Sequence, residues 1–427
     1  MEMSELDNMK TIYTSEWSIL KAKKIKEEYG EIDIDNSDYD LINKLEEERK
    51  LKINRLTEGI EIKTYSYVGT IRLSNFQVII KPKIEYIYLA KMISYSYNLD
   101  INDIRYYDSV SNLDIRKGAI TDLIALLYIQ EVEKIILKGL AKRYKQKEES
   151  ISTCRGIILF NDLAKKSTAE LTLPCRYREL TTDIAENRLI YSTLDFLKKL
   201  VNTSEISRKI NVLSERLSKK TTYQSLDKTL FQKVEIESNR LTQHYKLVFE
   251  LSRLIYDNYD FSLMTGETGF SSFLIDMNEL FEKFLYRLFE SSFESIIDVR
   301  YQNSLENGYI TSDGSNRSLI PDYKFYKDNE LIGIADAKYK DYNNKKVSSG
   351  DLYQLTTYAV ANTQNINTIM LFYPVQENQK TERYSLHSPF LENKIDIINI
   401  GIPIKNYLEN FQNTRDLLKV IIENNLR

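Results

Sequence analysis

Two charged residues, Asp336 and Lys338, end an apolar stretch in the last third of the sequence. Residues 331–335 are typical of a buried strand, and a charge at the end of such a strand costs free energy unless a partner holds it. Residues i and i+2 of a strand lie on the same face, so the carboxylate and the ammonium are presented together. The sequence therefore predicts a chemical site at this strand end.

A second carboxylate, Asp322, follows Pro321 at the start of the preceding strand candidate. A three-residue turn between the two strands places Asp322 opposite Asp336. A two-residue turn pairs Asp322 with Ala335 instead, and its side chain then faces away from Asp336 unless a bulge intervenes. Two converging carboxylates raise each other's pKa unless a cation lies between them, and oxygen ligands of this kind suit Mg²⁺.

Such a site favours hydrolysis of a phosphodiester bond. A bound metal lowers the pKa of water and neutralises charge on the phosphate, and Lys338 would stabilise the same developing charge. The acid-x-Lys tripeptide alone is weak evidence, because it recurs at Glu48-Arg-Lys50, Glu61-Ile-Lys63, Asp322-Tyr-Lys324 and Glu392-Asn-Lys394. A plain structural role is a turn acid for Asp322 and a solvated strand end for Lys338. Only Asp336-Ala-Lys338 ends an apolar strand that follows a Pro-Asp strand and precedes a helix.

The elements around these residues predict an α/β unit with a mixed sheet. Hydrophobic periodicity indicates a helix over 274–289 and a second over 350–362. The expected strands cover 296–301, 322–326, 331–339 and 367–373. The order is helix, three strands, helix, strand.

The rest of the chain predicts two further regions, so the fold class is α/β and α+β multidomain. Residues 59–84 alternate apolar and polar side chains and predict hairpins, with Pro82 at a strand end or edge. Long helices are expected over 123–136, 189–200 and 247–255, and a linker over 264–269. The predicted domains are a β-rich region (1–110), a largely helical middle domain (111–265) and a C-terminal domain (266–427). The charged run 46–50 is read as a solvated helical face.

Composition excludes several classes of function. Lys and Arg number 59 against 62 Asp and Glu, and a net charge of -3 supplies no general field for nucleic acid. No G-x-x-x-x-G-K-[ST] phosphate loop occurs, so we expect no nucleotide to bind this chain. Two cysteines, Cys154 and Cys175, and two distant histidines, His244 and His387, make zinc and a Cys-His nucleophile poor hypotheses. No leader or long apolar run is present, which favours the cytoplasm and no membrane.

Over residues 270–375 the sequence resembles the PD-(D/E)xK nucleases. Pro321-Asp322 and Asp336-Ala-Lys338 match the motif on its usual helix-strand-strand-strand-helix-strand core. Glu282 occupies the place of the additional acidic residue of that superfamily, and Gln354 with Tyr358 resembles the Q-x-x-x-Y of RecB-like members. The resemblance implies catalytic roles for six residues: Asp322, Asp336, Lys338, Glu282, Gln354 and Tyr358. It also implies that Asp322, Asp336 and Glu282 hold Mg²⁺, with Mn²⁺ able to substitute.

Each added position also has a plain structural reading. Gln354 and Tyr358 lie on one helical face and would form the polar edge of a packed helix. For Tyr358 this interpretation is as well supported as a role in substrate binding. Glu282 would be a surface acid beside Lys283. The joint order of the motif residues is what favours the nuclease interpretation.

A narrower resemblance is to McrC, the nuclease subunit of McrBC-type modification-dependent restriction systems. It rests on five stretches of this sequence: Val68-Gly69 leading to Ile79-Ile-Lys-Pro-Lys-Ile84, Arg155-Gly156, Cys175-Arg-Tyr-Arg-Glu-Leu180, Glu186-Asn187-Arg188, and Phe273-Leu-Ile-Asp-Met-Asn-Glu-Leu-Phe-Glu282. For residues 79–84 taken singly, a sheet edge is the simpler reading. In that family an amino-terminal part binds a ring-shaped AAA+ GTPase, the McrB-type partner, which recognises DNA and translocates, while the carboxy-terminal part cuts.

The resulting prediction is a Mg²⁺-dependent DNA endonuclease subunit of a McrBC-like restriction system that defends against phage and other foreign DNA. Its partners would be DNA and a McrB-like AAA+ GTPase or ATPase ring, which residues 1–110 would bind and whose activity this chain would stimulate. Two alternatives stay open. The chain is either a non-cleaving activator or scaffold of the NTPase, or an autonomous RecB-like nuclease.

Overall fold

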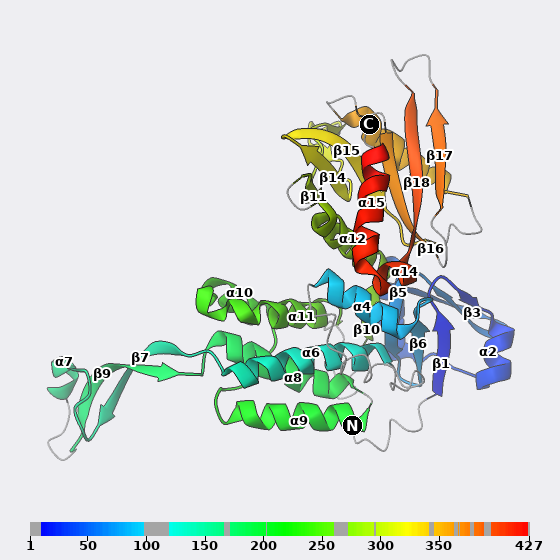
Figure 1. Cartoon of the computed structure of the whole chain (residues 1–427). Coiled ribbons are helices and arrows are strands. Elements are labelled where there is room, and N and C mark those ends of the chain that lie inside the picture. Colours follow the sequence, from blue (N-terminus) through cyan, green and yellow to red (C-terminus); the bar gives the residue numbers. More distant parts are fainter. Residues whose placement is uncertain are drawn as a thin grey trace. The chain divides into compact units, whose positions relative to one another are not determined.

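The computed structural model describes residues 10–97, 119–165, 171–201, 203–259, 272–293, 296–340, 346–362, 366, 368–375, 380–387 and 394–425. The chain divides into two compact units (Figure 1). The first unit joins 1–111 to 260–427, and the second consists of 112–259. The separate domains predicted for 1–110 and 266–427 therefore lie in one unit, and the finer three-domain division stays a prediction.

The front part of the first unit consists of two small sheets. One sheet has the order β1-β6-β5-β10, and the other has the order β2-β4-β3. Alternating apolar side chains from both sheets share one core, in which Ile12, Ile62 and Val78 are fully buried. The elements are β1 (Lys10–Ser15), β2 (Ile19–Leu20), α2 (Ala22–Tyr29), η1 (Asn36–Asp38), α3 (Tyr39–Glu47), β3 (Leu51–Leu56), β4 (Gly59–Thr64), β5 (Tyr67–Arg72), β6 (Phe76–Lys81), α4 (Tyr86–Ser96) and β10 (Ser272–Asp276).

The predicted hairpins of this region are confirmed, but the edge reading of residues 79–84 is wrong. Pro82 follows the end of β6, as expected, yet β6 lies between β1 and β5. The pairing with β1 is parallel and brings Thr14 opposite Ile80. No local pattern links strands so far apart in sequence. Of the charged run 46–50, helix α3 contains only the first two residues, since it ends at Glu47.

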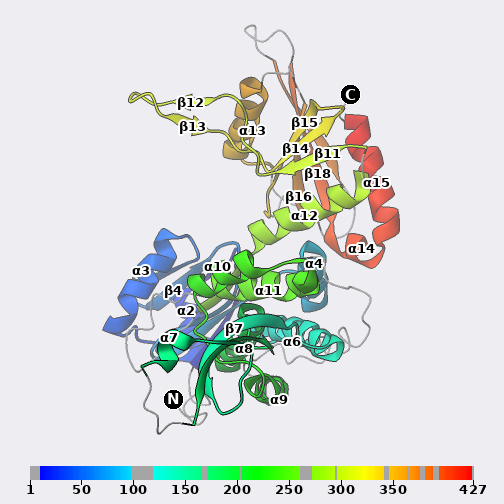
Figure 2. The same cartoon turned by 90° about the vertical axis from the view of Figure 1, so that its left-hand side faces the viewer.

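The rest of the first unit is a six-stranded mixed sheet with helices on both faces. Its order is β11-β14-β15-β16-β18-β17. Figure 2 shows α13 on one side of this sheet and α12 with α15 on the other. The elements are α12 (Met277–Phe293), β11 (Asp298–Tyr301), β12 (Gly308–Ile310), β13 (Asn316–Ser318), β14 (Tyr323–Lys327), β15 (Glu330–Ala337), α13 (Ser349–Ala361), β16 (Thr368–Val375), β17 (Thr381–Leu386), β18 (Ile395–Pro403), α14 (Ile404–Glu409) and α15 (Phe411–Asn425).

Side-chain alternation along the strands explains the two layers. Ile334 and Leu371 pack with Leu355 of α13 in one apolar cluster. The opposite face carries aromatic rings, and Phe289 of α12 lies 5.0 Å from Tyr323 and 5.0 Å from Phe372, centroid to centroid. The mixed sheet is confirmed, and its strands β11, β14, β15 and β16 follow the predicted order with the helices. The short β12-β13 hairpin between β11 and β14 was not predicted.

The predicted helix over 274–289 starts too early. Residues 272–276 form β10, which pairs antiparallel with β5, and α12 begins only at Met277. Gly69 of β5 allows this pairing, because a Cβ there would lie 2.0 Å from the Phe273 carbonyl oxygen. The predicted linker 264–269 lies outside the described residues.

The second unit is a helical bundle with a long β-hairpin. The three expected helices correspond to α6, α8 and α11, and the hairpin of β7 and β9 extends from the bundle (Figure 1). This hairpin was not predicted, because β7 reads RYKQKEESI and lacks an apolar face. The elements are α6 (Ala119–Lys138), β7 (Arg143–Ile151), β8 (Ile157–Ile158), α7 (Phe160–Leu163), β9 (Leu173–Thr181), α8 (Ala185–Leu200), α9 (Ser204–Ser218), α10 (Lys228–Glu237), η3 (Arg240–Tyr245) and α11 (Lys246–Asp257). Within the described part of the chain, every helix is too short or too polar to cross a membrane.

Candidate active site

The pairing of β14 with β15 decides whether the two aspartates face each other. The turn has two residues, Asp328 and Asn329, both with positive φ (52° and 67°), and Lys327 pairs with Glu330. A bulge at Phe325 and Tyr326 then shifts the register, so that Tyr323 pairs with Ala335. Extended by one position beyond the start of β14, this register puts Asp322 opposite Asp336. The shorter turn and the intervening bulge, both considered from the sequence, thus occur together.

Asp322, Asp336 and Lys338 meet at the end of β15. Lys338 Nζ lies 2.5 Å from Asp336 Oδ2, and the Ala337 N–H donates to Asp322 Oδ2 at 2.7 Å. Asp336 is only 1% exposed. Apart from this ion pair, neither Asp336 carboxylate oxygen has a hydrogen-bond partner of acceptable geometry among the described residues. A buried carboxylate with so few donors is unusual and costly.

Glu282 of α12 joins this group from the helix side. Its Oε2 accepts hydrogen bonds from Gln302 Nε2 at 3.2 Å and from the Tyr301 hydroxyl at 3.3 Å. The Tyr323 hydroxyl donates to the Glu282 backbone carbonyl at 2.8 Å, which ties the helix to β14. Tyr301 and Gln302 were missed from the sequence, because nothing in their local pattern marks them as partners of an acid.

The carboxylates oppose each other's ionisation. Burial, followed by the charges of Asp336 and Glu282, raises the pKa of Asp322 to about 9. Burial and then the Asp336 charge raise the pKa of Glu282 to about 7. Burial lowers the pKa of Lys338, but the neighbouring Asp336 and Asp322 outweigh it and the net pKa rises. Without a cation, the carboxyls therefore hold protons near neutral pH, because full ionisation would place more negative charge here than Lys338 neutralises.

Buried carboxyls that resist ionising together fit a divalent cation, which would replace their protons. In the parts of the chain that the structure describes, however, no three His, Cys, Asp or Glu side chains are already arranged as metal ligands. The carboxylates that sense each other nevertheless provide the oxygen donors that Mg²⁺ prefers. The buried Asp336 carboxylate, which has the Lys338 ion pair and no hydrogen bond among the described residues, is the observation that favours a cation here.

Gln354 and Tyr358 lie on α13 beside the site and differ in exposure. The Tyr358 ring is 3% exposed and packs in the cluster of Ile334 and Leu355, whereas Gln354 is exposed. Gln354 Nε2 donates to the Tyr358 hydroxyl at 2.7 Å, and that hydroxyl donates to the Ile320 carbonyl at 3.1 Å. Burial and the Asp336 charge raise the pKa of Tyr358 to about 12. Tyr358 is thus a core residue whose hydroxyl is affected by the charge of Asp336.

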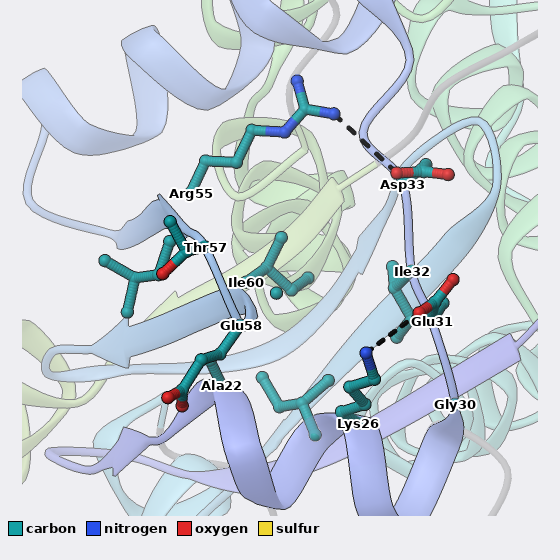
Figure 3. Close-up of a pocket in the computed structure, with 13 residues that line it drawn as sticks. Ala22, Lys26, Gly30, Glu31, Ile32, Asp33, Arg55, Thr57, Glu58 and Ile60 are labelled. Carbon is teal, nitrogen blue, oxygen red and sulfur yellow. Dashed lines mark hydrogen bonds and ion pairs between the residues drawn. The ribbon is translucent and has the colours of Figure 1, made fainter.

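A pocket of about 200 Å³ lies elsewhere, between α2 and the β3-β4 hairpin of the front part (Figure 3). Two ion pairs, Lys26 with Glu31 and Arg55 with Asp33, join residues of its lining. None of the six predicted site residues lines it. We favour the carboxylate group as the functional site, because its buried carboxyls raise each other's pKa and Lys338 is the cation that pairs with Asp336.

One known protein family matches most of this chain. The family model described as "McrBC 5-methylcytosine restriction system component" matches residues 62–374, which include all six predicted site residues. This chain belongs to the McrBC family. The resemblance noted in the sequence is thereby confirmed at the level of the family. No curated protein matches the chain in a sequence comparison.

Two solved structures are similar to this chain to different degrees. A chain in the half-complex from a tetradecameric assembly of Thermococcus gammatolerans McrB AAA+ hexamers with bound McrC is 18% identical, with a TM-score of 0.62. The match covers 94% of this chain and 99% of that chain. A chain of the cryo-EM structure of the Thermococcus gammatolerans McrBC complex is 20% identical over 66% of this chain and 88% of that chain, with a TM-score of 0.47.

The McrBC-like stretches outside the carboxylate site have structural roles in this fold. Gly156 has φ of 74°, and a Cβ there would lie 2.3 Å from the Arg176 carbonyl oxygen, so only glycine fits beside β9. Arg155 lies over the Tyr177 ring at 4.5 Å. Asn187 donates to the carbonyls of Ala141 and Thr182, at the base of the β7-β9 hairpin. These residues shape the hairpin and its attachment.

Proposed function

We propose that this member of the McrBC family is the DNA-cutting subunit of its restriction system, a metal-dependent endodeoxyribonuclease of the PD-(D/E)xK type. One observation carries the proposal. Asp322 and Asp336 converge beside Lys338 at a strand end, and their burial and mutual repulsion call for a cation. The helix-strand-strand-strand-helix-strand order around them supports the same conclusion.

Asp322 and Asp336 would hold Mg²⁺, with Glu282 contributing directly or through water, and Mn²⁺ would substitute. The ion would supply Lewis-acid stabilisation of the scissile phosphate. The Ala337 N–H fixes the Asp322 carboxylate, and Tyr301 with Gln302 fixes Glu282. These contacts orient the oxygen donors before any ligand arrives, which is what an efficient site requires.

Lys338 and the α13 residues act on the substrate side. The pKa of Lys338 is raised, so its ammonium stays charged and can stabilise negative charge on the phosphate during hydrolysis. Gln354 is exposed and donates to Tyr358, and this pair would position the DNA backbone next to the carboxylates. The apolar packing of the Tyr358 ring keeps α13 fixed against the sheet.

We further propose that cutting requires an AAA+ partner that hydrolyses GTP or ATP. The net charge of -3 provides no general attraction for DNA, and the sequence has no phosphate loop of its own. The structurally similar Thermococcus gammatolerans chain comes from an assembly of McrB AAA+ hexamers with bound McrC, which supports a partner of this class. A nuclease that depends on assembly would be kept from random cutting.

The test combines the purified chain, Mg²⁺ and methylated or unmethylated DNA, with and without the candidate partner and GTP or ATP. We expect cutting only in the complete mixture and none with D336A. Equal cutting by the isolated chain would favour the autonomous RecB-like nuclease.

The non-cleaving activator remains a second candidate, because the described residues hold no preformed group of three metal ligands. Stimulated NTP hydrolysis without any DNA cutting would favour it over the nuclease.

A further inference from the structure

The front part of the first unit places one buried carboxylate, Glu16, directly after β1. Glu16 is 0% exposed, and its Oε1 accepts the Lys83 N–H at 2.7 Å and the Tyr339 hydroxyl at 3.0 Å. Its other oxygen, Oε2, is buried and has no hydrogen-bond partner among the described residues. Burial raises the pKa of Glu16 to about 7 in spite of the two hydrogen bonds. A carboxylate this costly calls for a reason beyond packing.

Its partner Tyr339 directly follows Lys338 in the chain. The Tyr339 side chain is 5% exposed, and its ring lies 5.8 Å from that of Phe281, the residue before Glu282. Lys338 pairs with the Asp336 carboxylate, whereas the Tyr339 hydroxyl donates to Glu16, so the two consecutive side chains face different partners. Tyr339 is thus adjacent to two residues of the proposed site without belonging to it.

The Lys338 backbone is held from one side by β16, because its N–H donates to the Phe372 carbonyl at 2.9 Å. Beyond Lys338 the ladder with β14 and β16 has ended. The hydrogen bond from Tyr339 to Glu16 is therefore a second attachment for the peptide that carries the ammonium.

The front sheets and the six-stranded sheet belong to one unit, which makes this attachment firm. The Met277 N–H at the start of α12 donates to the Ser66 carbonyl at 3.0 Å, and Tyr95 of α4 packs on Phe284 of α12 at 5.7 Å. Glu16 itself is anchored by its own N–H, which donates to the Lys81 carbonyl at 3.1 Å.

We propose that Glu16 and Tyr339 are positioning residues for the carboxylate-lysine site, with the Glu16 carboxylate holding the Tyr339 hydroxyl so that Lys338 stays aimed at the phosphate. The proposal rests on the nuclease function proposed above and extends it to the front sheet. A displacement of β1 would shift Lys338 through the hydrogen bond between Glu16 and Tyr339. Cutting therefore depends on the front part of the chain as well as on the motif residues.

The experiment measures DNA cutting by the complete assembly, with kcat and KM for DNA, for Y339F, E16A and E16Q. Y339F and E16A should lower kcat by about 10-fold to 100-fold, the scale expected when a reacting group is misplaced by up to 1 Å, with KM unchanged. E16Q keeps an oxygen that can accept the Tyr339 hydroxyl and should retain most of the activity. The double variant E16A/Y339F should be no worse than the poorer single variant.

The matched control is Y384F. Tyr384 of β17 also donates its hydroxyl to a carboxylate, Glu382, at 3.1 Å, but at the far edge of the sheet, and its loss should change neither constant. If E16A does not fold, Y339F and E16Q still test the proposal, since each nearly preserves side-chain volume.

Wild type and D336A in the same assay separate the two proposals. A folded Y339F with wild-type kcat, beside an inactive D336A, would overturn the positioning role and leave the nuclease function intact. A loss confined to KM would also overturn it. No cutting by wild type under any condition would overturn both.

Discussion

Two groups of charged side chains in this molecule are treated in opposite ways. In the second unit, Asp183 accepts two hydrogen bonds from Arg188, at 2.8 and 2.5 Å, and others from Thr221 and Thr222. These donors, Arg188 first, hold the pKa of Asp183 well below its usual range. In the first unit, Asp336 has an ion pair with Lys338 and no hydrogen bond of acceptable geometry, and burial and carboxylate repulsion raise the pKa of Asp322.

The contrast teaches how a structural charge differs from a chemical one. Asp183 is satisfied within the chain and joins the start of α8 to the segment after α9, so it needs no ligand. The carboxyls around Asp336 cannot all ionise unless a cation from outside the chain joins Lys338, so without one they bind protons.

The largest expected effect follows from removing Asp336. D336A should lower the cutting rate of the complete assembly by about 10³-fold or more, since it removes a carboxylate that would hold the charge-stabilising metal ion. The variant should stay folded, because Asp322 still offers Lys338 a carboxylate. Cutting rate and thermal unfolding are measured on the same preparation, and a well-folded D336A that cuts at the wild-type rate would contradict the site.

Exchange of the metal should have the next largest effect. Mn²⁺ should support cutting, whereas Ca²⁺, with longer and more variable coordination, should bind but reduce the rate by about 10²-fold. Initial rates with each ion at saturating concentration provide the measurement. Equal rates with Ca²⁺ and Mg²⁺ would indicate a different chemistry.

D183N should affect stability and leave the chemistry alone. Losing the charge that accepts several hydrogen bonds should lower the free energy of unfolding of the second unit by about 2 kcal/mol. Urea unfolding measures this change, and the cutting rate of the folded variant should match wild type. A loss of cutting without a loss of stability would show that Asp183 is not a purely structural charge.

The pH dependence of stability should have opposite signs at the two groups. Asp322 and Glu282 have folded-state pKa values of about 9 and about 7, above their unfolded values, so the metal-free protein binds extra protons when folded. Its stability should therefore fall as pH rises from about 4 to about 9, by on the order of 1 kcal/mol per pH unit.

Asp183, with a lowered pKa, contributes stability that is present above about pH 4 and is lost only in stronger acid. Urea unfolding at several pH values in chelator measures both arms. D336N should flatten the alkaline arm, while D183N should flatten the acid one. An alkaline arm that D336N leaves unchanged would show that Asp336 does not drive the repulsion.

The sequence predicted that Asp336 and Lys338 lie together, but it did not predict the residues that hold the site in place. Acid, lysine and apolar strand lie close together in the chain, so alternation alone places Asp336 and Lys338 on one face. The bulge opposite Phe325, which brings Asp322 to the same face, was only an alternative, because no residue there requires it. Bulges depend on the fit of whole strands.

Long-range pairings were beyond the sequence for a different reason. Glu16 lies more than 300 residues from Tyr339 in the sequence. Strand β10 pairs with β5 of the front sheet, but part of β10 has a helical pattern and was predicted as helix. The charged hairpin of β7 and β9 has no apolar face, so its strands are set by cross-strand pairing rather than by burial.

The central claim is that the buried carboxylates at the end of β15 need a cation, and metal-dependent thermal unfolding tests it most directly. The melting temperature of wild type, D336N and D183N is measured in chelator and in saturating Mg²⁺. Mg²⁺ should raise the melting temperature of wild type and of D183N, because binding to the folded state stabilises it, and should leave D336N unchanged. An equal increase in D336N, or none in wild type, would contradict the account.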